Sequence, residues 1–258
     1  MRTLVDFNAD AGESFGRWKL GADAQLIPHM SSVNVACGWH AGDPMIMRQS
    51  VRYAKQGGVA LGAHPGLPDV TGFGRRAMAL SPEEAATACL YQFGALQALA
   101  AAEGVEVRHL KPHGALYGMT LRDDAVTEAI TNAVLAVDPD LIVVLLAGPT
   151  ADYGRRLGAR VAREAFADLD YDDNGHIIIE PDPPPKDPAR CARQAIGILN
   201  GTVTSTSGKR IDVDADTICI HGDRPNAVDI AVEIRRQFNA EGVRVAPMAD
   251  VIAEQPRP

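Results

Sequence analysis

Apolar and polar residues alternate near the start of this chain in a pattern that predicts a buried strand with one polar face. Within residues 4–10, Asp6, Asn8 and Asp10 share one parity, and the residues between them are apolar. Successive side chains of a strand point to opposite faces, so residues of one parity converge on one face. We therefore expect these three polar side chains to lie together.

Four further apolar runs lead into polar residues in the same way. Their polar residues are Asn34 with His40, His64, His109 with Lys111, and His221. Polar groups at strand ends, where loops begin, form the active-site rim of barrels and open α/β sheets. The repetition indicates one site that is assembled from several strands.

The apolar runs alternate with helical patterns along the chain. Strands are predicted near residues 3–8, 32–36, 59–63, 106–111, 141–146, 160–165 and 217–221, with a further strand at 243–246. Helices are predicted near 44–57, 82–103, 122–137, 149–157, 187–200 and 226–240. Such alternation indicates a mostly parallel sheet with crossover helices. Its seven or eight repeats favour a closed (β/α) barrel over an open sheet, in a single domain that spans 1–258.

Local signals refine this picture. Ser81, followed by a proline and two acids, is a typical helix start. Residues 202–213 are predicted to form a hairpin that turns at Ser207 and Gly208, and the proline-rich stretch 182–188 is predicted to be a loop. No stretch has the spacing of a Walker phosphate loop or of a GxGxxG dinucleotide fingerprint.

Composition narrows the function classes. The chain has 258 residues, of which 46% are hydrophobic and 22% charged, as in ordinary globular domains. Its formal net charge of -8 argues against nucleic acid or an anionic membrane as a partner. We expect no signal peptide and no segment long enough to span a bilayer. The four cysteines show no CxxC pairing, which predicts reduced thiols in a cytoplasmic protein.

The acidic residues of the first run suit catalysis. Asp6, Asp10 and Glu13 bring carboxylates to one strand end, where they suit a general base, a metal ligand or both. The alternative is that Asp10 caps a turn and Glu13 is solvated. The shared parity of the aspartates favours a function.

Two glycine-flanked segments add histidines and arginines. His40 lies in a polar loop and His64 closes a strand of small residues, so we favour site roles for both. Cys37 is interpreted as a small core residue, because it continues the apolar spacing of its strand. Arg75 and Arg76 follow a glycine-rich loop and suit a clamp on a carboxylate or phosphate, with a surface arginine pair as the alternative.

Two later strands end in ionisable groups. Lys111 closes a central strand, so we expect it to pair with a carboxylate or to serve a ligand. We interpret His113 as the site residue beside it and His109 as a core histidine. His221 and Asp223 suit an acid/base pair, with a turn aspartate as the alternative.

Eight motifs run in order along nearly the whole chain. They are DFNADAGESFG (6–16), NVACGWHAGDP (34–44), GAHPGLPDVTGFGRR (62–76), YQFGAL (91–96), HLKPHGALY (109–117), EAFAD (164–168), TVTSTSGK (202–209) and ADTICIHGD (215–223). With them, the chain resembles the LamB/YcsF family. The resemblance implies an irregular, seven-stranded β/α barrel like those of glycoside hydrolases and polysaccharide deacetylases. It also implies hydrolysis of the lactam of 5-oxoproline to glutamate, driven by ATP, in a 5-oxoprolinase whose B and C subunits are the partners.

The chain departs from the family pattern at a few positions. Leu169 stands where the family carries an arginine, and residues 177–185 replace a different family stretch. Arg224 and Asn226 also differ, and we expect Asn226 to cap the helix that follows it. These departures leave open whether the substrate is 5-oxoproline or another lactam or amide.

The residues and the resemblance together suggest a mechanism. ATP phosphorylates the lactam carbonyl oxygen, and water then attacks the activated carbon. We assign Asp10 as the base or as a metal anchor, with His40 and His64 beside it. These three residues are also the expected ligands of a divalent metal, should one be bound.

The remaining roles concern charge and proton transfer. Lys111 is assigned to stabilise negative charge, and either His113 or His221 to protonate the leaving nitrogen. The expected catalytic residues are Asp10, His40, His64, Lys111 and His113. The expected substrate-binding residues are Asn8, Glu13, Asn34, Arg75, Arg76, Glu164, His221 and Asp223.

Two other functions stay open on the sequence alone. One is a metal-dependent deacetylase or amidohydrolase that needs no ATP, and the other is a non-catalytic subunit that binds a carbohydrate or an amino acid. The many titratable groups argue for an enzyme. The metal, the subunit that binds ATP and the oligomeric state, a homo-oligomer included, also stay open.

Overall fold

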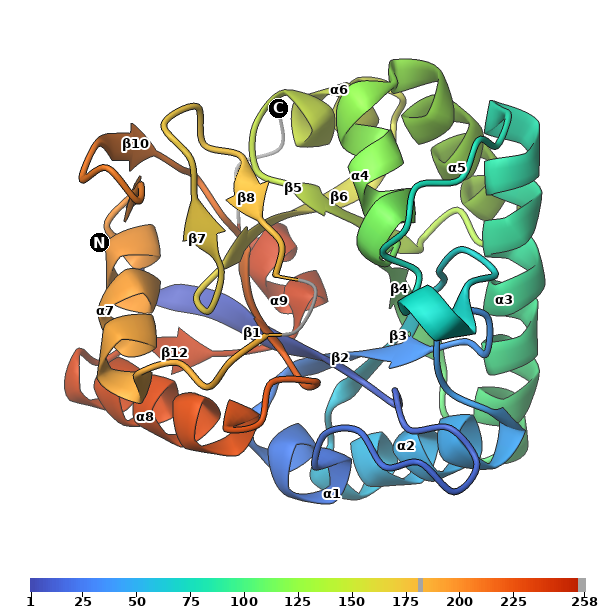
Figure 1. The fold of residues 1–258 in the computed structure, drawn as a ribbon, viewed down its shortest axis with the longest axis horizontal. Helices are drawn as coiled ribbons and strands as arrows, with labels where there is room; N and C mark the ends of the chain where they lie inside the picture. Colours follow the sequence, from blue (N-terminus) through green and yellow to red (C-terminus); the bar gives the residue numbers. More distant parts are fainter. Residues whose placement is uncertain (181–182, 255–258) are drawn as a thin grey trace.

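Seven parallel strands close into a barrel that is surrounded by helices (Figure 1). The computed structural model describes residues 1–180 and 183–254. The barrel strands are β1 (Leu4–Ala11), β2 (Ser32–Ala36), β3 (Ala60–His64), β4 (Val107–Leu110), β5 (Ile142–Leu146), β6 (Arg160–Phe166) and β11 (Thr217–His221). The predicted closed barrel is therefore confirmed, with seven strands. The strand predicted at 243–246 is β12 (Arg244–Val245), which pairs with β1 as an addition to the barrel.

Barrel closure places the polar ends of three strands at one level. β1 pairs in parallel with β2 on one side and with β11 on the other. In this register Asp10 lies opposite Asn34 in β2 and opposite His221 in β11. The ends of parallel strands meet at the same end of a barrel, so the polar residues predicted from separate runs do converge.

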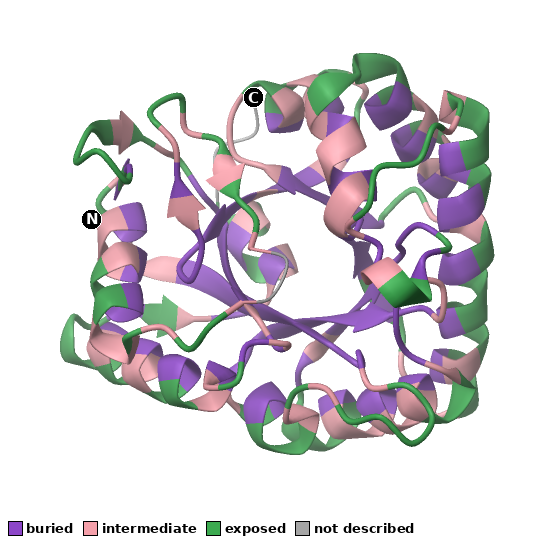
Figure 2. Cartoon of the chain, in the orientation of Figure 1, coloured by how far each residue is buried: buried purple, intermediate pink, exposed green. Residues whose placement is uncertain are grey.

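The two parities of β1 have different environments, although both are buried (Figure 2). Phe7 packs edge-on against Phe238, with ring centroids 5.8 Å apart, on the side of the surrounding helices. Asp6, Asn8 and Asp10 are held by polar side chains of the neighbouring strands instead. Strands covered on both faces are expected in a parallel barrel, and the polar interior here is the foundation of the site.

Most of the helices cover the outside of the barrel (Figure 1). The helices are α1 (Asp23–Leu26), α2 (Pro44–Gly57), α3 (Pro82–Ala102), α4 (Gly114–Arg122), α5 (Asp124–Val137), α6 (Pro149–Arg156), α7 (Pro188–Leu199), α8 (Ala227–Ala240) and α9 (Met248–Ala253), with 3-10 turns η1 (Ile27–His29) and η2 (Val70–Gly72). The helix predicted at 122–137 is confirmed as α5, which begins two residues later after Asp123, whose side chain caps it; α4 was not predicted. α9 was not predicted; its Met248 packs against Ile142 at the start of β5.

The predicted helix start at Ser81 is confirmed, and Asn226 occupies the N-cap position of α8 as predicted, although without a capping bond from its side chain. Ser81 forms a full capping box with Glu84 at the start of α3. Asn226 precedes α8, but its side chain makes no capping bond. It bonds the backbone N–H and C=O of Lys186 instead, so it ties the β11–α8 loop to the segment before α7.

The segment between β6 and α7 contains structure that was not predicted. β7 (Asp170–Tyr171) and β8 (Ile177–Ile178) form a short antiparallel hairpin. The predicted hairpin at 202–213 is confirmed as β9 (Thr202–Thr204) paired with β10 (Arg210–Asp212). Residues 183–187 of the predicted proline-rich loop are irregular, and Pro181 and Asp182 lie outside the described residues.

One helix is long and apolar enough to cross a membrane by length and composition alone. α3 has 21 residues and contains an 18-residue window with a mean hydropathy of 1.2, so the expectation that no segment reaches this length is wrong. Its Cys89, Phe93 and Leu96 are buried, and it packs on α5 and on β3. A core helix of a globular domain passes the same test.

Candidate active site

A pocket opens at the carboxyl ends of the barrel strands. Its lining residues come mainly from strand ends and the loops that follow them, and they include Asp10, His64, Lys111, His113, Phe166 and His221. Leu169, Ile179 and Glu180 contribute from the segment after β6. The pocket therefore lies where active sites of β/α barrels are found.

A buried ion-pair cluster forms the floor of the pocket. The Lys111 ammonium lies 2.9 Å from Asp10 Oδ1 and 3.0 Å from Glu164 Oε1, and all three side chains are almost fully buried. Burial works against the Lys111 charge, but these two carboxylates outweigh it and hold its pKa well above the usual value. Lys111 is thus a permanent cation at neutral pH, as the predicted carboxylate pairing required.

Asp10 is the centre of the cluster. Its Oδ1 also accepts a hydrogen bond from Asn34, and its Oδ2 lies 3.3 Å from His64 Nε2 and 3.8 Å from His221 Nε2. Burial opposes ionisation, but His64, Lys111 and His221 outweigh it and hold the pKa of Asp10 well below its usual value. An anionic carboxylate with one oxygen aimed at two imidazoles is suited to moving a proton.

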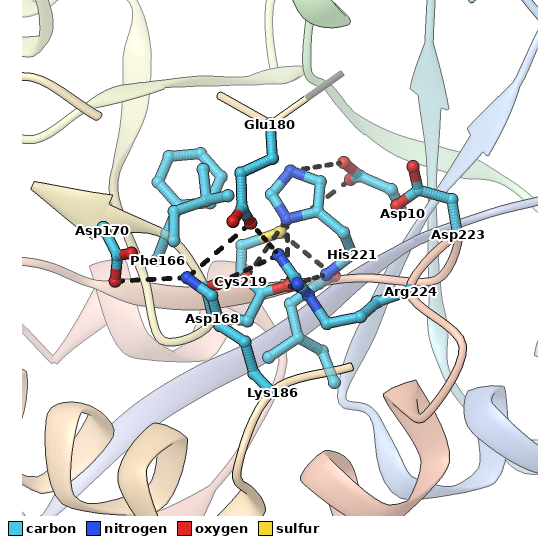
Figure 3. A network of polar contacts seen from close by, with 12 residues as sticks. Asp10, Phe166, Asp168, Asp170, Glu180, Lys186, Cys219, His221, Asp223 and Arg224 are labelled. Atoms are coloured by element: carbon cyan, nitrogen blue, oxygen red, sulfur yellow. Dashed lines mark hydrogen bonds and ion pairs between the residues drawn. The ribbon is translucent and has the colours of Figure 1, made fainter. Parts of the chain in front are cut away.

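A second carboxylate orients His221 (Figure 3). Asp168 lies 3.1 Å from His221 Nδ1 and also accepts the backbone N–H of His221 at 3.0 Å. Burial lowers the pKa of His221, but Asp168 outweighs burial and raises it above the usual value. The predicted pairing of His221 with Asp223 is therefore wrong: Asp168 takes that place, and Asp223 pairs with Arg75 at 2.8 Å.

Several predicted residues lie beneath the pocket rather than in its lining. Asn34 links Asn8 to Asp10 through its side-chain amide, and His109 bonds Asn34 Oδ1 at 2.8 Å. Glu164 Oε2 accepts a hydrogen bond from Tyr117 at 3.0 Å. These residues hold the floor in position. His109 is the buried, bonded core histidine that was predicted, and Cys37 is likewise buried.

Glu13 and three histidines form a second cluster beside the floor. Their ligand atoms all lie within 4.8 Å of one another. Glu13 Oε1 is 3.8 Å from His40 Nε2 and 4.0 Å from His113 Nδ1, and His113 Nδ1 is 3.0 Å from His64 Nε2. The rings of His40 and His113 are stacked, with centroids 3.7 Å apart. The cluster therefore differs from the predicted metal set, since Glu13 and His113 join His40 and His64, and Asp10 belongs to the ion-pair cluster.

The two neighbouring arginines separate. Arg75 lines the pocket, pairs with Asp223 and stacks over Phe73 at 4.8 Å. Arg76 pairs with Asp69, and its side chain is 65% exposed. The predicted clamp of two arginines is therefore reduced to Arg75.

A charged rim closes one side of the pocket, at the segment where a departure from the expected family pattern was predicted. Arg224 is buried and reaches both Asp168, at 3.3 Å, and Glu180, at 3.1 Å. Lys186 faces Asp170 at 3.1 Å and Glu180 at 3.8 Å. Figure 3 shows Glu180 extending into this group, beside His221. The departing residue Leu169 is buried and lines the same pocket.

Sequence reasoning missed Asp168, Tyr117 and Glu180 as parts of this site. Asp168 follows β6 by two residues and belongs to the EAFAD motif, so the motif was the one available signal. Tyr117 lies inside α4, which was not predicted. Glu180 follows the unpredicted β7–β8 hairpin.

Comparison with known proteins gives a consistent result over the full barrel. The model of the LamB/YcsF family matches residues 5–253. A Pyrococcus furiosus protein, named as the A subunit of 5-oxoprolinase, is 48% identical over 252 residues, which cover 96% of this chain and 99% of that protein. The crystal structure of a lactam utilization protein from Thermus thermophilus superposes with a TM-score of 0.86 at 46% identity, covering 95% and 99% of the two chains. A peptidoglycan N-acetylglucosamine deacetylase, with a TM-score of 0.53 at 11% identity over 100% and 91% of the chains, shares the fold alone.

Proposed function

This chain belongs to the LamB/YcsF family, and from that premise we propose that it hydrolyses the lactam of 5-oxoproline to glutamate as the A subunit of an ATP-dependent 5-oxoprolinase. The names of its relatives support this substrate and a hydrolase activity. The observation that carries the proposal is the buried Asp10–Lys111 pair, with His221 held beside it by Asp168.

The reaction needs ATP because an unactivated lactam is a poor electrophile. Transfer of the γ-phosphoryl group to the lactam carbonyl oxygen releases ADP and activates the ring carbon. A first water then adds to that carbon, and cleavage of the C–N bond leaves γ-glutamyl phosphate. A second water releases phosphate and glutamate, so two waters are consumed for each ATP.

The residues of the floor match the demands of these steps. Asp10 is ionised and takes a proton from the attacking water. Lys111 is cationic and stabilises negative charge on the oxygen of the reacting carbon. His221, whose pKa is raised by Asp168, is the acid that protonates the leaving nitrogen. Arg75 pairs with the substrate carboxylate at the wall of the pocket.

Partner subunits supply the nucleotide site in this proposal. The sequence has no Walker loop, so B and C subunits are assigned the binding of ATP. Large exposed apolar side chains gather in segments that follow β1, β2, β3 and β6, and they include Trp18, Met45, Val70, Ile178 and Ile179. These segments surround the pocket end of the barrel, which supports the docking of a partner there. We place the assembly in the cytoplasm.

The experiment is glutamate release from 5-oxoproline by this chain alone and with B and C subunits, each with and without ATP. We expect release only from the complete mixture with ATP. Asp10→Asn protein in the same mixture is the control for release by contaminating enzymes. No release from a mixture whose B and C subunits support a reference A subunit would contradict the proposed substrate, and the segment 169–185 would be the place to seek a different one.

A second candidate is a metal-dependent amidohydrolase that acts without ATP. The cluster of Glu13, His40, His64 and His113 favours it, because one carboxylate and three imidazoles are suitable ligands for Zn²⁺. A bound divalent metal supplies Lewis-acid polarisation of a carbonyl oxygen. This candidate predicts turnover of amide substrates by the isolated chain. A non-catalytic subunit would instead show ligand-induced stabilisation without turnover in any mixture.

A further inference from the structure

We propose that Glu13, His40, His64 and His113 bind one divalent transition-metal ion, with Zn²⁺ as the best match. The site adjoins the ion-pair floor, since His64 Nε2 lies 3.3 Å from Asp10 Oδ2, but its proposed ligands do not include Asp10. The inference goes beyond the proposed function and does not depend on its substrate, because it concerns a binding site that can be measured without turnover.

Two facing histidines present lone pairs to each other. His64 Nδ1 lies 2.7 Å from the carbonyl oxygen of Lys111, and His113 Nε2 lies 2.7 Å from the carbonyl oxygen of Phe73. A carbonyl oxygen only accepts, so both of these nitrogens carry the ring proton. The other nitrogens, His64 Nε2 and His113 Nδ1, then face each other as acceptors at 3.0 Å. Two unprotonated acceptors at this distance need a positive species, a proton or a metal ion, and the Asp10 carboxylate 3.3 Å from His64 Nε2 also favours one there.

The backbone bonds also prepare these rings as ligands. A metal-binding histidine commonly donates its second ring N–H to a carbonyl or carboxylate, which fixes the tautomer and the ring orientation. His64 and His113 both have this arrangement in the protein alone. The bonds therefore direct both lone pairs toward Glu13 and His40.

His40 is a buried ring without a polar partner. It is fully buried, and neither nitrogen has a hydrogen-bond partner within the part of the chain that the structure describes. The ring is also confined, since a Cβ atom at Gly66 would lie 2.3 Å from His40 Nδ1 and one at Gly74 would lie 2.7 Å from His40 Cβ. Buried polar atoms are rarely left unpaired. An ion in front of His40 Nε2, between it and Glu13, satisfies the nitrogen.

The spacing of the four ligand atoms suits a tetrahedral ion. Zn–N and Zn–O bonds of about 2.0–2.1 Å in a tetrahedron place ligand atoms roughly 3.3 Å apart. Three of the six separations are 3.0, 3.8 and 4.0 Å, on both sides of this value, and all six lie within 4.8 Å. The ligands come from the segments that end β1, β2, β3 and β4, so the barrel itself sets their positions.

The test is metal binding by the full chain in the absence of substrate and partners. Protein dialysed against a chelator is titrated with ZnCl2 in a calorimeter, and with CoCl2 while the visible absorption of the ion is followed. We expect one ion per chain and a Co²⁺ spectrum with histidine ligation. His40→Gln and Glu13→Gln should each weaken binding by at least about 100-fold, since loss of an outer partner alone costs about 10–100-fold.

His109→Gln is the matched control, because it makes the same change at a buried histidine outside the cluster. It should bind the ion as the wild-type chain does, and thermal unfolding of each variant checks the fold. If the wild-type chain binds no ion, the positive species is a proton shared by His64 and His113, and the proposal is overturned. Binding by His40→Gln as tight as that of the wild type would also overturn it. Neither result bears on the lactam assay, which is measured with partners and ATP.

Discussion

The two buried clusters at the end of this barrel lie next to each other, and they differ in how well their own atoms satisfy them. In the ion-pair floor, Lys111 is matched by Asp10 and Glu164, and Asp10 also receives a hydrogen bond from Asn34. In the cluster of Glu13 and three histidines, two lone pairs face each other and His40 has no hydrogen-bond partner among the described residues.

The contrast indicates in which cluster the protein's own side chains satisfy the buried polar groups. Buried charges cost free energy even when they are paired, so a fully paired set inside a pocket points to chemistry rather than to stability. A histidine without a hydrogen-bond partner among the described residues, beside two imidazole nitrogens that face each other, points to a cation that the protein binds. We therefore assign the reacting groups to the floor and a cation to the second cluster.

The largest expected effect comes from breaking the floor. Lys111→Met removes the cation and leaves Asp10 and Glu164 unpaired, so we expect turnover with partners and ATP to fall by about 10³-fold. The free energy of unfolding should fall by about 3–5 kcal/mol. Glutamate release and thermal denaturation measure the two effects. Lys55→Met, at an exposed site on α2, is the control, and near wild-type turnover in Lys111→Met would refute the role of the floor.

The second-largest expected effect concerns His221, the proposed acid for the leaving nitrogen. Asp168→Asn leaves His221 without the carboxylate that raises its pKa, so turnover should fall on the order of 10²-fold. The acid works while His221 is protonated, so activity is lost as pH rises through its pKa. The variant lowers that pKa, and the alkaline limb of the pH–rate profile should move to lower pH. If the alkaline limb of the profile does not move, the acid is a group other than His221.

The smallest of these effects separates the two neighbouring arginines. Arg75→Met should raise the KM for 5-oxoproline roughly tenfold, the equivalent of about 1.4 kcal/mol of binding. Arg76→Met should leave the KM close to that of the wild type, since Arg76 is directed toward Asp69. Steady-state kinetics on the two variants give the comparison. Equal KM values for the two variants would show that Arg75 does not bind the substrate.

Much of the site was predictable because strand parity and strand ends are visible in the sequence. Asp10, Lys111 and His221 each lie at the end of a barrel strand, and the barrel brings them together. Asp168 was missed because it lies between its strand and a short hairpin with no periodic pattern. Asp10 was predicted as a metal ligand because parity places a side chain on a face but does not reveal that Lys111 pairs with it.

The elements of the fold that were not predicted from the sequence were missed for similar physical reasons. The alternation of strands and helices was sufficient to predict the barrel, because its elements are long and apolar. α4 was missed because only three residues separate it from β4 and it ends at Arg122, with a single residue, neither glycine nor proline, between it and α5. The β7–β8 hairpin has only two residues in each strand, and Tyr171 accepts a backbone hydrogen bond from Thr206, a tertiary contact that no local pattern reveals.

The most direct test of the division between the clusters compares Asp10→Asn with Glu13→Gln. Both changes replace a buried carboxylate by an amide of the same shape, at positions close together in the chain. Calorimetric titration with ZnCl2 should show affinity weakened at least about 100-fold by Glu13→Gln and less than about tenfold by Asp10→Asn. If Asp10→Asn weakens the affinity as strongly as Glu13→Gln does, the two clusters are a single metal site and the division between them is contradicted.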